Sequence, residues 1–225
     1  MLRKDVNNTL NIGASKNETE TCPYTCKKCI KLSKTEMGIC SFLFKNKFQI
    51  ICPNYFIKTD FVDLAANLIF KHANYKVIKE LKYKDNFFDY VVINNDNYKD
   101  FFVIELQTLD TCGSYKYFLN KSKKPLSINW KTTEKNLVSQ IVEKGQILKK
   151  YNSKLIVIIQ DTFFDYLDIH STNEEDNDII FIIYENKANE LKFQKSITFS
   201  IEAIKNRFNF DNDEDLIDII YKKIS

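Results

Sequence analysis

Glycine and proline are scarce in this chain, which holds only 4 Gly and 3 Pro among its 225 residues. A glycine-rich loop of the kind that cradles phosphates is therefore excluded, and so is a long flexible linker between domains. The sequence also lacks an apolar run of about 18 residues, so no transmembrane helix is predicted. Residues 1–20 are rich in Asn, Lys, Thr and Glu and contain no apolar signal segment, which predicts a cytoplasmic protein.

Positive charge is mild, and arginine is almost absent. The net charge is +3, which neither indicates nor excludes a nucleic-acid partner, because only clustered positive charge neutralises phosphates. Arg3 and Arg207 are the only arginines, so bidentate arginine contacts to guanine would contribute little to any recognition of DNA. Lysine, asparagine and glutamine side chains would have to make such contacts instead.

Cysteines are concentrated near the amino terminus, where five of the six lie between Cys22 and Cys52. Disulfides are rare in the cytoplasm, so this cluster favours a tetrahedral metal site with four thiolates over a disulfide framework or free thiols. Cys40 and Cys52 flank two apolar runs around a turn at residues 45–47, which predicts a hairpin that brings these two thiols together.

The second pair of thiolates is left open by the spacing. Cys26 and Cys29 have the commonest knuckle spacing, whereas the other option pairs Cys22 with Cys29. Cys112 stands apart from the cluster and is predicted to be a free thiol.

Two apolar segments, residues 87–93 and 101–107, predict an antiparallel hairpin with acidic side chains at one end. Side chains two residues apart share a face of a strand, so Glu105 and Gln107 point the same way and Asp89 can lie across from them. Two carboxylates would then converge where an ion that prefers oxygen ligands can bind against substrate phosphates. The alternative is that Glu105 ends its strand facing water and Asp89 is an ordinary hairpin carboxylate.

A longer string gives the hairpin a specific interpretation. Residues 103–116 read VIELQTLDTCGSYK. This string closely resembles the active-site segment of NotI-like type II restriction endonucleases, which runs roughly Leu-Glu-Ile-Gln-Thr-Met-Asp, two further residues, then Gly-Ser-Tyr-Lys. That family belongs to the PD-(D/E)XK nuclease superfamily and carries Gln where most members carry Lys, a place that Gln107 takes here. The resemblance reaches back to the amino-terminal cysteines and forward across much of the chain.

The resemblance implies a fold and a set of site residues. The fold is α/β, a PD-(D/E)XK restriction-endonuclease-like core with a mixed central sheet flanked by helices and a small amino-terminal metal-binding lobe with four cysteine ligands. Asp89 and Glu105 would bind catalytic Mg²⁺, and Gln107 would orient the attacking water or the scissile phosphate. The ligands of one structural metal, zinc or iron, would be the four thiolates that match the family's cysteine segment: Cys22, Cys29, Cys40 and Cys52.

Gln107 cannot supply the positive charge that a lysine would, so the metal or a nearby cation must do so. Lys116, within the matched string, is one candidate for that cation, although it can equally contact phosphate. Glu80 lies where many superfamily members place a helper carboxylate, and an exposed acid at a strand end is the alternative for it.

Three regions are expected along the chain: a poorly ordered arm at 1–20, the cysteine lobe at 21–57 and the nuclease domain at 58–225. Apolar spacing predicts a helix from Asp60 to about Asn74, capped by Thr59. The remaining expected elements are strands at 76–82, 87–93 and 99–107, an irregular segment at 108–130, a helix at 134–150, and strands at 155–159 and 179–184. On the second helix, the inward side chains would be Leu137, Ile141 and Leu148, with Gln140, Lys144 and Gln146 elsewhere on its surface.

These observations predict a type II restriction endonuclease that uses Mg²⁺ to cleave both strands of double-stranded DNA at one specific sequence. A homodimer is expected, because one site cuts one strand and two-fold protein symmetry matches a palindromic target. A cognate DNA methyltransferase would be a functional partner. The competing hypotheses are a DNA repair or mobile-element nuclease on the same core, and a non-catalytic DNA-binding module.

Overall fold

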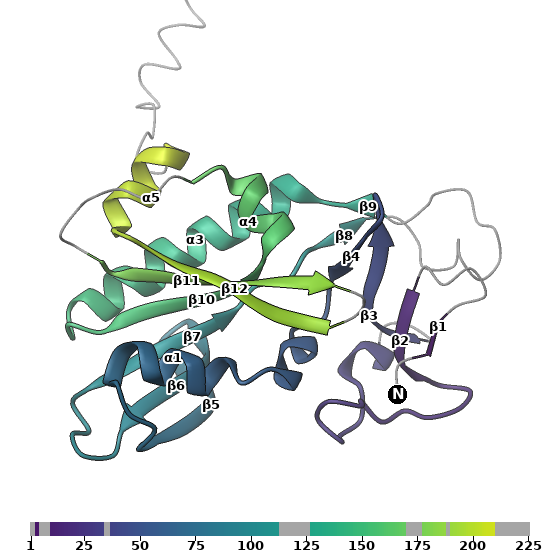
Figure 1. Ribbon diagram of the computed structural model, residues 1–225, viewed down its shortest axis with the longest axis horizontal. Coiled ribbons are helices and arrows are strands. Elements are labelled where there is room, and N and C mark those ends of the chain that lie inside the picture. The colour runs from purple at the N-terminus through teal and green to yellow at the C-terminus, as the bar shows by residue number, and fades with distance from the viewer. Residues whose placement is uncertain are drawn as a thin grey trace, which may run out of the picture.

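The computed structural model describes residues 3–4, 10–33, 37–112, 127–169, 177–187 and 190–209. The strands in these residues form a six-stranded sheet, a four-stranded sheet and a two-stranded ribbon, and helices pack on the larger sheet (Figure 1). The fold is therefore mixed α/β, with a central mixed sheet flanked by helices, as the sequence predicts.

The larger sheet has the strand order β12-β11-β10-β7-β6-β5. Strand β10 runs parallel to both β7 and β11, and the other three neighbouring pairs are antiparallel. Parallel strands are covered on both faces, which explains the unbroken apolar run from Leu155 to Ile159 in β10. The strand bounds are β5 Tyr75–Tyr83, β6 Asn86–Asn94, β7 Phe101–Leu106, β10 Lys154–Gln160, β11 Ile179–Lys187 and β12 Glu190–Phe199.

Helices cover both faces of this sheet. Side chains of α1 pack with Phe102 and Ile104 on one face, and side chains of α3, α4 and α5 pack with Val103 and Val157 on the other. The helix bounds are α1 Phe61–Phe70, α3 Trp130–Lys149, α4 Asp161–Leu167 and α5 Ile201–Phe208. No helix in the described part of the chain combines the length and apolar character needed to cross a membrane.

The smaller sheet has the order β1-β2-β3-β4 and is antiparallel throughout. The predicted hairpin is confirmed, since β3 and β4 are joined at Lys45 and Asn46, both with positive φ. The remaining bounds are β1 Arg3–Lys4, β2 Leu10–Ser15, β3 Met37–Phe44, β4 Lys47–Ile50, the 3-10 helices Ile30–Ser33 and Pro53–Lys58, and the ribbon β8 Thr111–Cys112 with β9 Ser127–Ile128.

The predicted arm at residues 1–20 requires a correction. Strand β2 pairs with β3, and its Leu10 and Ala14 side chains are buried in the small sheet. The polar composition of the surrounding residues hides this short apolar alternation. Residues 1–2 and 5–9 lie outside the described residues.

Helix boundaries also differ from the prediction. Helix α1 begins at Phe61 and ends at Phe70, and the Thr59 hydroxyl donates to the Phe56 carbonyl (2.8 Å) instead of capping it. Helix α3 begins at Trp130, four residues earlier than predicted, because the Asn129 side chain accepts from the Thr132 amide (3.4 Å). Within the segment expected to be irregular, β8 and β9 form a short ribbon, and residues 113–126 lie outside the described residues.

The two sheets share their hydrophobic cores. Phe42 of β3 belongs to the same buried cluster as Val103 of β7, and Ile50 of β4 belongs to the cluster that contains Ile104 and Ile158. The cysteine segment is thus built into the core of the larger sheet. The boundary between residues 57 and 58 stays a prediction.

Candidate active site

Asp89 and Glu105 face each other where strands β6 and β7 part. The ladder between these strands runs from the pair Ile93 and Phe101 to the pair Tyr90 and Ile104. Beyond that point, backbone amides of the two strands donate to carboxylate side chains instead of to the carbonyls of the neighbouring strand. The amide of Leu106 donates to Asp89 Oδ2 (2.9 Å), and the amide of Asp89 lies 3.4 Å from Glu105 Oε1. The open end of the strand pair therefore holds two carboxylates side by side.

The carboxylates line a cleft of about 490 Å³. Gln107 also lines it, and its backbone amide donates to the Ile158 carbonyl in β10 (2.9 Å). The Gln107 side-chain amide donates to the Thr108 carbonyl (2.6 Å). The other described residues around the cleft are Pro53, Asp85, Asn86, Phe87, Leu106, Thr108, Asp110, Asn136, Gln140 and Lys144.

The electrostatics of the cleft disfavour two ionised carboxylates in the absence of a metal ion, even with Lys144 beside Glu105. Glu105 is only 7% exposed, and burial followed by the nearby charge of Asp89 raises its pKa to about 7. Burial also raises the pKa of Asp89, with a smaller contribution from the charge of Glu80. An ion that neutralised both groups would relieve this cost.

Lys144 lies in a different place from the one that the sequence predicts. Instead of lying elsewhere on the surface of the second helix it is buried, and its Nζ donates to Glu105 Oε2 at 2.6 Å. The signal is present in the sequence. Lys144 follows Ile141 by three residues and precedes Leu148 by four, so it falls on the inward stripe of α3. An inward lysine in such a stripe indicates a buried anionic partner.

The other predicted residues are placed as follows. Glu80 lies in β5 with a positive φ of 55° and is exposed, close enough for its charge to act on Asp89. Lys116 lies outside the described residues. Asn136, one turn before Gln140 on α3, donates to Asp110 Oδ2 (3.2 Å) at the edge of the cleft. The apolar spacing of α3 does not indicate that Asn136 and Gln140 border the cleft.

Of the amino-terminal cysteines, Cys40 lies in β3 of the small sheet, and the others lie outside its strands. Cys22, Cys40 and Cys52 are buried, Cys29 is partly buried, and Cys26 and Cys112 are exposed. The hydrogen bond between the thiols of Cys40 and Cys52 lowers the pKa of Cys52 to about 6. Among the described residues, no group of three or more His, Cys, Asp or Glu side chains stands ready to hold a metal.

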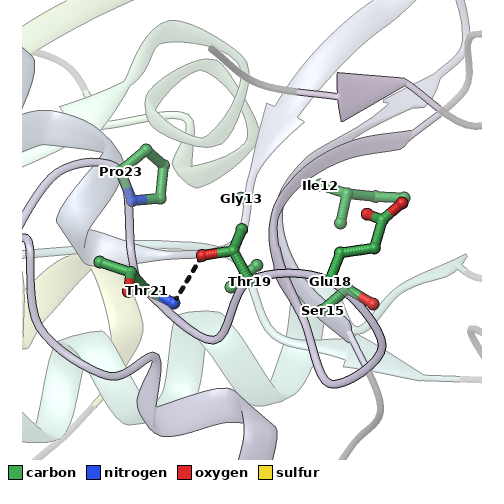
Figure 2. Close-up of a pocket in the computed structure, with 8 residues that line it drawn as sticks. Ile12, Gly13, Ser15, Glu18, Thr19, Thr21 and Pro23 are labelled. Carbon is green, nitrogen blue, oxygen red and sulfur yellow. Dashed lines mark hydrogen bonds between the residues drawn. The ribbon is translucent and has the colours of Figure 1, made fainter.

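A second cavity, of about 210 Å³, is lined by residues of β2 and of the loop that follows it (Figure 2). Within that loop, the Thr21 amide donates to Thr19 Oγ1 (3.3 Å). Glu18 is the single charged residue among its described lining, so this cavity offers far less to a cation or a phosphate than the carboxylate cleft does.

Comparisons with known proteins give one family match. A sequence model of the restriction endonuclease NotI family matches residues 6–195. No curated protein sequence matches this chain. Among solved structures, the chain is similar to SfsA of Pyrococcus furiosus in complex with Ca²⁺, with 9% sequence identity and a TM-score of 0.40, covering 88% of this chain and 93% of that one.

Proposed function

This chain belongs to the restriction endonuclease NotI family, and from that premise we propose that it is a type II enzyme that uses Mg²⁺ to cut both strands of DNA at a specific sequence. Membership of the family makes the chain a nuclease, and hence a hydrolase that acts on DNA. The finer assignment is supported by one observation above the others: Asp89 and Glu105 meet at the open end of the β6–β7 pair, inside a cleft.

The donor set in the cleft fits Mg²⁺. Magnesium takes one or two protein carboxylates and fills its other positions with water and substrate phosphate, so a site with two carboxylates suffices. Burial and the repulsion between neighbouring carboxylates raise the pKa values of Asp89 and Glu105, and a bound divalent cation would offset the energetic cost of ionising them. When bound there, Mg²⁺ would lower the pKa of a water molecule and neutralise charge that develops on the phosphate.

The side chains of this chain have distinct roles in the proposed reaction. Asp89 and Glu105 hold the ion, and the backbone contacts described above fix their carboxylates at the strand ends. Gln107 orients the water or the scissile phosphate, because it is part of the cleft wall and its amide has both donors and an acceptor. The order helix, three strands, helix, strand, given by α1, β5 to β7, α3 and β10, supports a PD-(D/E)XK core.

We also propose that Cys22, Cys29, Cys40 and Cys52 hold one structural metal, zinc or iron. Their burial supports this set over Cys26, which is exposed at a turn. Two glycines leave room for the thiols: a Cβ on Gly13 would lie 2.7 Å from Cys40 Sγ, and one on Gly38 would lie 2.5 Å from Cys29 Sγ. Metal analysis of Cys22→Ser and Cys26→Ser tests the assignment, since loss of metal from the Cys26 variant alone would favour the knuckle pair.

Cleavage of DNA by site variants tests the proposed function. The substitutions Asp89→Asn and Glu105→Gln keep side-chain shape but remove the charge that binds Mg²⁺, so they should abolish cutting and leave DNA binding largely intact. Asp165→Asn, which alters an exposed carboxylate on α4, is the matched control and should cut like the wild type. Wild-type cutting rates in both site variants would show that the site is misassigned.

The pattern of fragments separates this function from its competitors. One short target sequence, protected by a methyltransferase encoded nearby, is expected for a restriction enzyme acting in the cytoplasm. Fragments without a common end sequence would instead indicate a repair or mobile-element nuclease. Binding to DNA without any cutting in Mg²⁺ would indicate a DNA-binding module.

A further inference from the structure

The ammonium group of Lys144 lies at the base of the carboxylate cleft. The side chain is 5% exposed, and its Nζ is 2.6 Å from Glu105 Oε2 and 5.8 Å from the centre of the Phe88 ring. Helix α3 fixes the backbone behind it, since Gly145 packs tightly against Ile201 of α5. The charge is therefore held in place before any substrate arrives.

Stability alone does not account for a charge at this position. Burying an ion pair costs desolvation energy that the mutual attraction of the two groups often fails to recover, and an apolar side chain of similar volume fills such a site equally well. A methionine at position 144 opposite an uncharged residue at 105 would fill the same space. The pair must therefore be explained by what it does to the cleft.

The side chains that line the cleft carry more negative than positive charge, which is unfavourable for a phosphate group. Among the described residues that line the cleft, four are carboxylates, namely Asp85, Asp89, Glu105 and Asp110, and Lys144 is the single cation. A phosphodiester is itself an anion and gains a further negative charge in the transition state of hydrolysis. Such a group requires positive charge beyond what Gln107 provides, because an amide is neutral and its Nε2 already donates to the Thr108 carbonyl.

We infer that Lys144 supplies the fixed positive charge of this site, contacting the scissile phosphate from helix α3 while it holds Glu105 in place. This inference rests on the proposed nuclease function and names a catalytic residue for it. Lys144 enters the cleft from helix α3, whereas Asp89 and Glu105 enter it from strands β6 and β7, so the phosphate meets a cation that belongs to the protein itself.

Single-turnover cleavage and DNA affinity, measured together for Lys144→Met, test the inference. The rate should fall about 100-fold or more, as it does when one fixed group that stabilises transition-state charge is removed, while the dissociation constant for DNA stays within about threefold. Lys144→Arg keeps the charge and should stay within roughly tenfold of the wild type. Lys150→Met, which removes an exposed lysine at the end of the same helix, is the matched control and should cut at the wild-type rate.

Moving the charge separates catalysis from a structural role. In the double variant Gln107→Lys with Lys144→Met, a lysine enters the cleft from β7 and the contact from α3 stays absent. The double variant should cut at least about tenfold faster than Lys144→Met, because the cleft has regained its cation. A folded Lys144→Met that cuts within about threefold of the wild type would overturn the inference, and so would a double variant no faster than the single one.

The same series distinguishes this inference from the proposed function. If the wild type cuts DNA, Asp89→Asn does not, and Lys144→Met cuts normally, then the nuclease site stands and only the role of Lys144 fails. If the wild type does not cut DNA at all, the proposed function fails and the role of Lys144 fails with it. Thermal unfolding of each variant confirms that the proteins compared are folded.

Discussion

At the scale of single residues, Glu105 makes stability depend on pH in the protein free of divalent ions. Its pKa is raised from 4.5 to about 7 by burial and by the charge of Asp89, so the folded state binds more protons than the unfolded state between these values. The free energy of unfolding should therefore fall as pH rises from about 4.5 to about 7 and then level off. One pKa unit corresponds to about 1.4 kcal/mol, so the loss is at most roughly 3.5 kcal/mol. Urea unfolding in a chelator across this range measures it.

Glu105→Gln is the comparison for that measurement, because Gln does not titrate. The variant should lose most of the fall in stability between these pH values, and saturating Mg²⁺ should reduce the fall in the wild type. Identical pH profiles for the wild type and the variant would contradict the assigned cause.

Replacing Gly38 tests how closely the Cys29 thiol packs against β3. A Cβ at this position would lie 2.5 Å from Cys29 Sγ, so Gly38→Ala forces the thiol or the strand to move and should destabilise the fold by about 1–3 kcal/mol. Gly145→Ala is the comparison: its Cβ would also be tightly packed, 3.0 Å from the tip of Ile201, but the end of a flexible side chain can move aside and alanine favours a helix by about 1 kcal/mol. Urea unfolding should show a loss for Gly38→Ala only. Equal stability of Gly38→Ala and the wild type would rule out the close contact.

The sequence predicts some of these residues and misses others for identifiable reasons. Asp89 and Glu105 come together as expected, because strand alternation and a hairpin fix which side chains share a face. Lys144 is missed because a charged residue is expected on the outer face of its helix, although its spacing from Ile141 and Leu148 indicates the inner one. The partner that makes burial acceptable is 39 residues away in sequence, and no local pattern reveals it.

At the scale of secondary-structure elements, Gln160 joins the two sheets. Its side chain lies at the end of β10, accepts from the Ile50 amide (2.9 Å) and donates to the Phe48 carbonyl (2.8 Å), so it serves β4 as a neighbouring strand would. Gln160→Leu leaves the buried Ile50 amide unpaired and leaves the Phe48 carbonyl with only its longer bond from Asn186 (3.3 Å), so it should cost roughly 1–3 kcal/mol. Gln146→Leu, at an exposed position on α3, is the control.

Urea unfolding of Gln160→Leu and Gln146→Leu tests whether the Gln160 side chain joins the two sheets. A loss confined to Gln160→Leu, accompanied by slower cleavage, is expected because β4 supports the segment that follows Glu105. If both variants unfold at the wild-type urea concentration, the side chain does not join the sheets in the way described.

The elements themselves are largely predictable, and their ends are not. Strands β5, β6, β7, β10 and β11 agree with the apolar runs that predict them. The start of α3 depends on the Asn129 cap, and β2 depends on pairing with β3, which lies more than 20 residues further on. Neither the Asn129 cap nor the pairing of β2 with β3 can be predicted from the composition of a short stretch of sequence.

At the scale of the whole molecule, we expect a homodimer to carry out double-strand cleavage. Asp89 and Glu105 give the described part of each copy one facing carboxylate pair in the cleft, so each copy is expected to cut one strand. Sedimentation should show a homodimer at working concentration, and single-turnover cleavage should produce cuts in both strands within one binding event. A monomer that makes both cuts in one binding event would overturn this prediction.

The short segment after β7 passes from one sheet to the other. The Gln107 amide donates to Ile158 in the larger sheet (2.9 Å), and the Leu109 amide, two residues on, donates to Ile50 in the smaller one (3.1 Å). Because only one residue separates these two amides, a displacement of the small sheet would shift Gln107 in the cleft. Local opening of the small sheet would disturb the position of Gln107 while the larger sheet remains folded. Hydrogen exchange at the Leu109 amide would register that loosening before any global unfolding.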